Sequence, residues 1–272
     1  MGGAMESTRE LVRLRSEVKA WLETKIPKDV ELPTPGHDLG EFWVQWTLNF
    51  RKELGAKGWL APNWPTYLGG GGYSPAASQV IMDELRKRQL PPLGIHGTWT
   101  TTLRVWGTEE QKGRWLPPTL QGEIIVNQIV SEPNGGTDLA TKATTAVRDG
   151  DEYIINGEKG YIGALLPPDY LFILLTMDVN GPRYENLGMV IVDAHDPGVS
   201  ISHRTTLMGL TQSSFTLNDV RVDPEDIVGG ERGGWHVAQT LLDVERGGNG
   251  VTLEESRDVE KREREYWTKQ AP

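Results

Sequence analysis

The spacing of apolar residues changes near Gly122, and this change constrains the fold more than any other feature of the chain. Before it, apolar residues recur every three or four positions, which is typical of amphipathic helices. After it, short runs rich in β-branched and aromatic residues alternate with turn residues, which is typical of strands. Helical spacing returns at Gly234. This order favours separate helical and β domains over alternating β-α-β units.

The predicted fold class is therefore α+β, in three parts. Residues 7–122 form an N-terminal α-helical domain, and residues 123–231 form a small β-sandwich or barrel. Residues 232–272 are the start of a C-terminal helical domain that is incomplete. Its helix from Gly234 to about Gly247 has no companion helices after it to cover its apolar face. Residues 254–269 are so dense in Glu and Arg that they predict a solvated helix or a frayed tail.

Capping and turn residues place several of these elements. Ser7 and Glu10 form a possible capping box, and the second helix, from Asp38 to near Gly55, carries one apolar stripe. The Asp149-Gly150 pair predicts a hairpin. The stripe is Phe42, Trp46 and Phe50; further helices are expected over 74–88, 98–106 and 109–120, and strands over 124–130, 143–148, 153–155, 171–176, 189–192, 199–202 and 214–222.

The composition disfavours several classes of protein. With 28 basic and 38 acidic side chains the formal net charge is -10, which disfavours a nucleic-acid surface, because binding phosphates needs clustered Lys and Arg. There is no Cys, so disulfides, thiolate zinc sites and a cysteine nucleophile are excluded, and a cytoplasmic location fits best. The longest apolar run, Tyr170 to Met177, is far shorter than a membrane span. We therefore expect no membrane insertion.

Common catalytic motifs are missing from the sequence. It contains no GxGxxG between a strand and a helix, no Walker A sequence and no GxSxG elbow. The five His show no ligand spacing such as HExxH, so no metal is expected. The Trp-rich helical region could stack sugars, but Trp at helical spacing is more often part of a core.

One segment, Gln128 to Asp138, has the composition of a ligand loop. It leaves an apolar strand and enters a loop with two adjacent Gly and several hydrogen-bonding side chains. Such a loop can bring backbone N–H groups and hydroxyls close to a flat polar heterocycle or a phosphate. Pro-Asn-Gly-Gly is also ordinary hairpin chemistry. The local sequence leaves both interpretations open.

The same segment resembles a known family. S-E-P-N-G-G-T-D at 131–138 is similar to T-E-P-x-A-G-S-D, the flavin-binding loop of the acyl-CoA dehydrogenase family. Four further segments resemble motifs of that family in the same order, and the chain is identified as a member on these grounds. They are the helix before the β domain at 106–117, the G-x-x-Y-x-I-N-G-x-K hairpin at 150–159, the D-V-R-V-P strand at 218–222, and the first C-terminal helix at 243–246.

The resemblance implies an FAD cofactor lying across the β domain and a CoA thioester substrate. The positions that match the family's cofactor contacts are Gln128, Val130, Ser131, Thr137, Tyr161 and Gly163, and those that match its substrate contacts are Thr137, Asp243 and Arg246. Ser131 and Thr137 each keep the hydroxyl that the family uses. Arg246 is equally sensible as a cation at the C-terminal end of a helix.

Two departures from the family pattern affect the expected site. The second flavin motif, W-I-T or W-I-S, here reads Tyr161-Ile162-Gly163, so the hydroxyl that bonds flavin N5 in the family is missing. The family's general base is a Glu in the C-terminal helical domain, and this chain ends at Pro272, after that domain's first helix. The catalytic residue is therefore unassigned, because Glu254 and Glu255 fit a solvated helix face better.

The resemblance implies α,β-dehydrogenation of a CoA thioester, with hydride transfer to FAD and an electron acceptor such as an electron-transfer flavoprotein. We expect a homo- or hetero-oligomer, in which a partner chain could complete the site. Two alternatives stay open. The chain could be a non-catalytic structural or regulatory subunit that has lost flavin, or a flavin oxidase or monooxygenase of the same fold, since fold does not fix the reaction.

Overall fold

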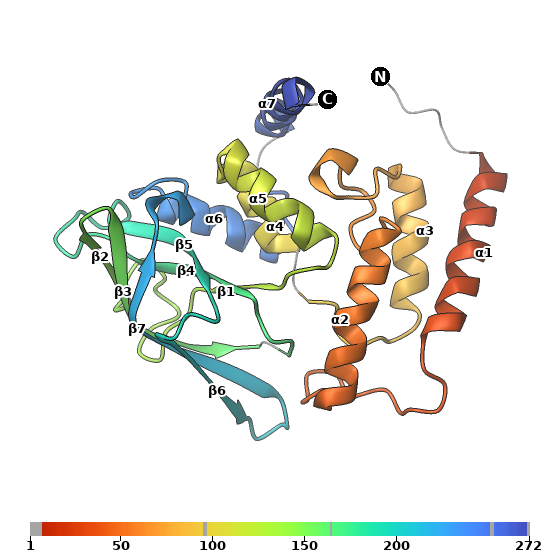
Figure 1. Cartoon of the computed structure of the whole chain (residues 1–272), viewed down its shortest axis with the longest axis horizontal. Helices are drawn as coiled ribbons and strands as arrows, with labels where there is room; N and C mark the ends of the chain where they lie inside the picture. Colours follow the sequence, from red (N-terminus) through yellow and green to blue (C-terminus); the bar gives the residue numbers. More distant parts are fainter. Residues whose placement is uncertain (1–6, 95–96, 164, 251–252, 271–272) are drawn as a thin grey trace. The chain divides into compact units, whose positions relative to one another are not determined.

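The computed structural model describes residues 7–94, 97–163, 165–250 and 253–270, and its elements follow the predicted order of helices, strands and helices (Figure 1). The helices are α1 (Thr8–Lys25), α2 (Gly40–Ala56), α3 (Pro75–Arg86), α4 (Gly97–Trp106), α5 (Glu109–Leu120), α6 (Gly234–Glu245) and α7 (Leu253–Gln270), with short 3-10 turns at Thr66–Leu68 and Pro224–Asp226. The strands are β1 (Val126–Ile129), β2 (Thr145–Asp149), β3 (Glu152–Ile162), β4 (Tyr170–Thr176), β5 (Leu187–Asp193), β6 (Val199–Thr205), β7 (Thr211–Val222) and β8 (Ile227–Val228).

The capping box at the start of α1 is confirmed. The Glu10 backbone N–H donates to Ser7 Oγ at 3.3 Å, and the Ser7 backbone N–H donates to Glu10 Oε2 at 2.7 Å. These two bonds satisfy donors that a helix start otherwise leaves without partners. The buried side of α1, at Val18 and Leu22, packs in a core with residues of α2 and α3.

The predicted apolar stripe of α2 is wrong at Phe42, whose side chain is exposed. The buried face instead begins at Trp43 and continues through Thr47, Phe50 and Leu54. Successive residues of a helix are rotated by about 100° about its axis. Because the buried face starts at Trp43 rather than at Phe42, Phe42 points away from the core. The Trp43 indole N–H donates to Glu31 O at 3.0 Å and so finds the partner that a buried indole needs.

The glycine run at 69–72 is explained by close backbone packing. A Cβ on Gly70 would lie 2.3 Å from Trp64 Cβ, and one on Gly71 would lie 2.2 Å from Gly58 O. No side chain fits at such distances, so these glycines allow the loop to fold back on itself.

The strands form one hydrogen-bonded sheet, in the order β6-β7-β3-β2-β4-β5-β8, with β1 paired to β4. β1 runs parallel to β4, whereas the β2–β3 hairpin is antiparallel and turns at Gly150, which has a φ of 65°. The predicted Asp149-Gly150 hairpin is therefore confirmed. β3 extends to Ile162, well beyond the predicted 153–155, and brings Lys159 to Tyr161 into the sheet.

Helices α4 and α6 pack on each other, and α6 packs on β4 and β5 (Figure 1). A Cβ on Gly234, the first residue of α6, would lie 2.5 Å from the Leu187 backbone, so glycine permits this close approach to β5. The Trp106 indole donates to Thr240 Oγ1 at 2.9 Å between the two helices. The apolar face of α6 is thus covered by elements that precede it in the chain, so the cover that the sequence did not show after α6 comes from α4 and the sheet.

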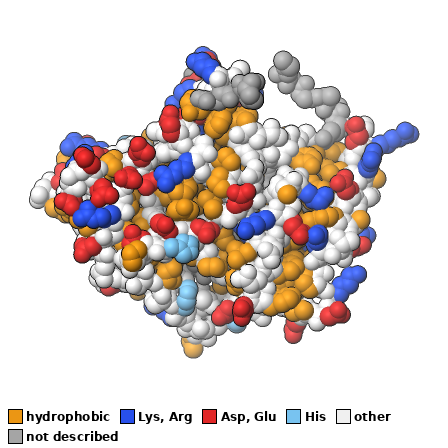
Figure 2. Space-filling model, in the orientation of Figure 1, with side chains coloured by type: hydrophobic (Ala, Val, Ile, Leu, Met, Phe, Trp, Pro, Cys, Tyr) orange, Lys and Arg blue, Asp and Glu red, His pale blue; other side chains and the backbone are white. Residues whose placement is uncertain are grey.

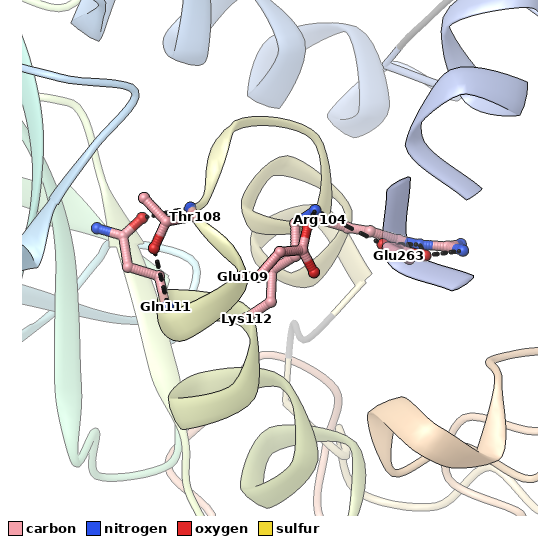
Figure 3. Close-up of polar contacts among 6 residues, drawn as sticks. All are labelled: Arg104, Thr108, Glu109, Gln111, Lys112 and Glu263. Carbon is pink, nitrogen blue, oxygen red and sulfur yellow. Dashed lines mark hydrogen bonds and ion pairs between the residues drawn. The ribbon is translucent and has the colours of Figure 1, made fainter. Parts of the chain in front are cut away.

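The prediction of a solvated or frayed tail over 254–269 is also wrong for one face of α7. Val259 and Glu263, four residues apart, are buried. Arg104 of α4 donates from Nε and Nη2 to the Glu263 carboxylate at 2.9 and 2.8 Å, and Lys112 Nζ lies 3.8 Å from it (Figure 3). The buried carboxylate is therefore matched by cations from helices more than 150 residues away, which the local charge density did not reveal.

The chain divides into two compact units, residues 1–94 with 117–123 and residues 95–116 with 124–272. The first part of α5 and all of α4 thus group with the sheet rather than with α1 to α3. The predicted domain boundaries, 7–122, 123–231 and 232–272, follow chain order and stay predictions. Over the β-sheet unit, the face shown in Figure 2 carries acidic and basic side chains interspersed with each other.

Candidate functional site

The loop that follows β1 is built by its own backbone. The Glu132 N–H donates to Gly135 O at 2.9 Å, and the Gly135 N–H donates to Glu132 O at 3.2 Å. These reciprocal bonds close the turn at Pro133-Asn134, as the hairpin interpretation of this segment expects. The same turn leaves Pro133, Asn134 and Gly136 to Asp138 exposed.

The loop is joined to the second half of β3. The Gly160 N–H donates to Ser131 O at 3.1 Å, and the Tyr161 hydroxyl donates to Pro133 O at 3.4 Å. The β3–β7 register shifts between Lys159 and Ile162, and Tyr161 has a φ of 63°, which is uncommon for a residue with a side chain. This bulge directs Tyr161 out of the ladder, a role that bulges often have near sites.

A buried ion pair lies beneath the loop. Lys159 Nζ is 2.7 Å from Glu132 Oε1 and also donates to Leu174 O on β4. The Ala143 and Thr144 backbone N–H groups donate to the Glu132 carboxylate at 2.7 and 3.1 Å. Burial by itself would raise the pKa of Glu132, but the Lys159 charge and these hydrogen bonds hold it below its ordinary value. Burial lowers the pKa of Lys159 to about 8.

Lys142 is a second buried lysine of this region. Its side-chain nitrogen is buried and has no hydrogen-bond partner in the part of the chain that the structure describes. Burial lowers the pKa of Lys142, although the charges of Glu132 and Asp138 act in the opposite direction. Its carbonyl oxygen accepts from Thr176 Oγ1 of β4 at 2.9 Å. Two lysines and one glutamate are thus buried together under the loop.

Several groups in and near the loop have no hydrogen-bond partner among the described residues, or carry bare backbone, and suit an external ligand. Gln128 Oε1 and Asn127 Nδ2, in the middle of β1, are buried without hydrogen bonds to the described residues. A Cβ on Gly135 or Gly136 would meet its nearest atom at 4.0 or 3.9 Å, and one on Gly163 would meet nothing within 4 Å. None of these three glycines has a positive φ. Neither packing nor backbone conformation therefore requires glycine here, and the bare backbone is open to a flat ring or a phosphate.

Tyr161 already has a partner on its ring. The Arg204 guanidinium of β6 lies 4.4 Å from the ring centroid, and it also donates to Gln212 Oε1 at 3.0 Å. Half of the Tyr161 side chain is nevertheless exposed. Stacking of a cation on the ring is favourable in itself, so a ligand would have to share the ring or displace the arginine.

The other end of the loop is held by Asp138. Its carboxylate accepts two hydrogen bonds from Arg183 Nη2, at 2.7 and 2.8 Å, and one from the Ala140 N–H. The Arg183 hydrogen bond is the largest cause that lowers the pKa of Asp138. Thr137, beside it, is exposed. Arg183, in the β4–β5 connection, therefore holds the loop at Asp138, the residue after Thr137.

The structure brings some of the predicted site residues together and sets others on a different element. The loop-to-β3 bonds join Ser131 to Gly160 and Tyr161 to Pro133. Gln128 and Val130 lead into the loop, and Gly163 follows β3. The substrate candidates Asp243 and Arg246 lie at the C-terminal end of α6 and are exposed there.

Asp243 has a structural contact of its own. Its Oδ2 accepts from the Gly250 N–H at 2.9 Å, which fixes the turn after α6. Thr240 and Gly250 line a cavity of about 980 Å³, together with residues of α4 and α7. The residues of the 131–138 loop are not among those lining it.

Sequence reasoning assigned no role to Glu132, Lys142 or Lys159. A signal for Lys159 was present, because Tyr153 and Ile155 point inward and alternation continues to Lys159. A lysine at an inward position of a strand needs a buried partner, and Glu132 is that partner. Among the described residues, no group of three or more His, Cys, Asp or Glu is arranged to hold a metal ion.

Two family models match the chain, one for each of its main segments. The model "Acyl-CoA dehydrogenase, N-terminal domain" matches residues 8–123, and "Acyl-CoA dehydrogenase, middle domain" matches residues 127–220. Among the described helices, none is long and apolar enough to cross a membrane.

Individual relatives agree with this assignment. The acyl-CoA dehydrogenase FadE29 of Mycobacterium tuberculosis is 34% identical over 77% of this chain and 61% of its own length. The solved Tcur3481-Tcur3483 steroid ACAD is 34% identical, with a TM-score of 0.74 over 91% of this chain and 64% of its own. The ChsE4-ChsE5 complex from Mycobacterium tuberculosis is 28% identical, with a TM-score of 0.69 over 89% and 61%. The chain thus spans less than two thirds of the length of these relatives.

Proposed function

This chain belongs to the acyl-CoA dehydrogenase family, and from that premise we propose that it is an FAD-binding subunit that acts in the α,β-dehydrogenation of a CoA thioester. The observations that carry the proposal are the open backbone of Gly135, Gly136 and Gly163, and Gln128 Oε1, which is buried without a hydrogen-bond partner among the described residues. A polar atom buried without a partner is costly, and a bound ligand would remove that cost.

The residues fit the cofactor at the loop. Gln128 and Val130 would hold it from the end of β1, Ser131 and Thr137 would offer hydroxyls, and Tyr161 would offer an exposed ring. When bound, FAD supplies the acceptor for the hydride that leaves the β-carbon. The chain's own part is to orient the ligand and to exclude water from it.

We propose a carboxylate from a partner chain as the general base. Of the carboxylates in the loop, Glu132 is buried in an ion pair and Asp138 is engaged by Arg183, so neither is free to take a proton from substrate. Relatives in solved structures include Tcur3481-Tcur3483 and the ChsE4-ChsE5 complex, whose names contain two proteins each. An electron-transfer flavoprotein is the acceptor that we propose for the electrons.

Asp243 and Arg246 remain the proposed contacts for the CoA portion. Both are exposed and lie in the last turn of α6 and directly after it. Arg246 offers a planar cation that suits a phosphate, and Asp243 keeps its Oδ1 available while Oδ2 holds Gly250. The acyl group is not assigned.

The test is reconstitution of the purified chain with FAD, followed by removal of free flavin and measurement of the visible absorbance spectrum. We expect flavin absorbance to remain with the protein, and anaerobic addition of a suitable acyl-CoA, with a partner chain present, to bleach it. Gly136→Leu is the matched variant, because it fills the open backbone with a side chain whose Cβ would meet its nearest atom, Ser131 Oγ, only at 3.9 Å. It should abolish retention of FAD without changing thermal unfolding.

A second candidate function is a non-catalytic subunit that has lost flavin. The Arg204 guanidinium on the Tyr161 ring and the missing hydroxyl at Gly163 favour it. The absence of flavin absorbance after reconstitution, both alone and with a partner chain, would support this candidate and contradict the first.

A further inference from the structure

The Glu132–Lys159 pair connects four separate segments of the chain. Glu132 belongs to the loop, and its carboxylate accepts from the Ala143 and Thr144 backbone in the segment before β2. Lys159 belongs to β3, and it donates to Glu132 and to Leu174 O of β4. Neither side chain is more than 4% exposed.

A buried ion pair of this kind is not explained by stability alone. Removing two charges from water costs free energy that their attraction offsets only in good geometry, and apolar residues of similar size often stabilise a protein as well or better. A buried ion pair instead fixes the relative position of the two chain segments that carry its charges, because each charge finds few alternative partners in a dry interior.

The position that this pair fixes is that of the loop. Ser131, one residue before Glu132, accepts the Gly160 N–H, one residue after Lys159, at 3.1 Å. The ion pair and this backbone bond therefore join the same two chain segments, the loop and β3, at adjacent residues. A shift of Glu132 would move Ser131 and the open backbone of Gly135 and Gly136 with it.

We propose that Glu132 and Lys159 are positioning residues, which hold the 131–138 loop against β3 in the geometry that receives the cofactor. This inference rests on the proposed function for the identity of the cofactor. The position of the loop itself is a property of the chain without any ligand.

Lys142 explains why the carboxylate is needed in this place. Its buried nitrogen has no hydrogen-bond partner within the described ranges, and its charge acts on the same glutamate. Loss of the Glu132 charge would leave two lysines facing each other in the interior, and their repulsion would push the segments under the loop apart.

The test compares Glu132→Gln/Lys159→Met, which removes both charges of the pair, with Lys159→Met, which leaves Glu132 buried beside the Lys142 charge. The matched control is Glu152→Gln/Arg221→Met, which removes an ion pair of 2.8 Å that joins β3 and β7 at the surface. The measurements are FAD affinity, thermal unfolding, and hydrogen exchange of the 131–138 amides without FAD.

We expect both buried variants to bind FAD at least about tenfold more weakly than the wild type and the control, with faster exchange of the loop amides. The double variant should not regain affinity, although it removes the carboxylate charge that Lys159→Met leaves buried at Glu132. Leu171→Ala, which opens a cavity in buried β4, supplies a variant of lowered stability with the loop pair intact, and it should keep FAD affinity.

Two results would overturn the inference. One is wild-type FAD affinity and loop exchange in the double variant. The other is a loss of affinity in Leu171→Ala equal to that in the double variant. If the wild type itself binds no FAD, the proposed function fails, and the exchange of the loop amides still decides whether the pair holds the loop.

Discussion

Gly163 bears on both candidate functions, the FAD-binding subunit and the subunit that has lost flavin. It follows β3 at the place where the family motif has a hydroxyl, and a Cβ there would meet nothing within 4 Å. The space for a larger side chain therefore exists, and only the hydrogen-bonding group is missing. Sequence reasoning identified the missing group, and the structure shows that the fold does not forbid it.

Gly163→Thr should bind FAD more tightly than the wild type. One added hydrogen bond contributes about 0.5–1.5 kcal/mol, which corresponds to roughly a two- to tenfold lower Kd. The measurement is FAD titration followed by flavin fluorescence. Gly97→Thr is the control, because it places the same side chain at another glycine with no atom within 4 Å. Equal affinities in wild type and Gly163→Thr would refute the match of this position to the family motif.

Glu132 should make stability depend on pH in the acid range. Its pKa is held below the ordinary value of 4.5, so its ionised form stabilises the fold above pH 4.5 and this contribution is lost as pH falls below it. Glu132→Gln should lower the free energy of unfolding by about 3–5 kcal/mol at pH 7, because Lys159 is left buried without its partner. Thermal unfolding from pH 7 to pH 3 should show this difference shrinking.

The control for the pH series is Glu158→Gln, which removes an exposed carboxylate from β3, one residue before Lys159. This variant shows how the loss of one surface charge changes thermal unfolding over the same pH range. A difference between wild type and Glu132→Gln that stays constant down to pH 3 would contradict the ionised buried pair.

At the scale of elements, α7 shows the limit of local charge patterns. Its many Glu and Arg predict a solvated helix, yet Glu263 is fully buried and paired with Arg104 of α4 (Figure 3). The helical spacing itself was correct, because it depends on neighbouring residues. Which face of the helix is covered depends on α4 and α5, and these are distant in the sequence.

Glu263→Gln should loosen α7. It leaves the Arg104 cation without its buried carboxylate, at an expected cost of about 3–5 kcal/mol to the free energy of opening α7. Hydrogen exchange of the 258–269 amides measures this free energy. Glu260→Gln, on the exposed side of the same helix, should change it by less than about 0.5 kcal/mol. The docking of α7 would be refuted by equal exchange in the two variants.

At the scale of the whole molecule, the chain contains two compact units whose boundary lies within α5. Each has a core of its own, with Leu54 buried in the first and Leu171 in the second. The sequence predicts helices and strands in the right order but does not show that α4 groups with the sheet. That grouping comes from its contacts with α6 and β1.

We expect the two units to unfold in separable transitions. Leu54→Ala should lower the stability of the first unit and Leu171→Ala that of the second, each by about 2–5 kcal/mol, because each leaves a cavity in one core. Differential scanning calorimetry would show one transition moving in each variant. A single transition that moves alike in both variants would show that the units unfold together.

The sequence by itself determined the order of the elements, the capping box at Ser7, the hairpin at Gly150 and the family. The first three features depend on residues a few positions apart. The family depends on several short motifs that follow one another along the chain in the family's order. The tertiary structure alone decided that Lys159 pairs with Glu132, 27 residues away, and that Arg104 pairs with Glu263, 159 residues away. A buried charge is stable only beside its partner, and the fold, rather than the local sequence, brings such partners together.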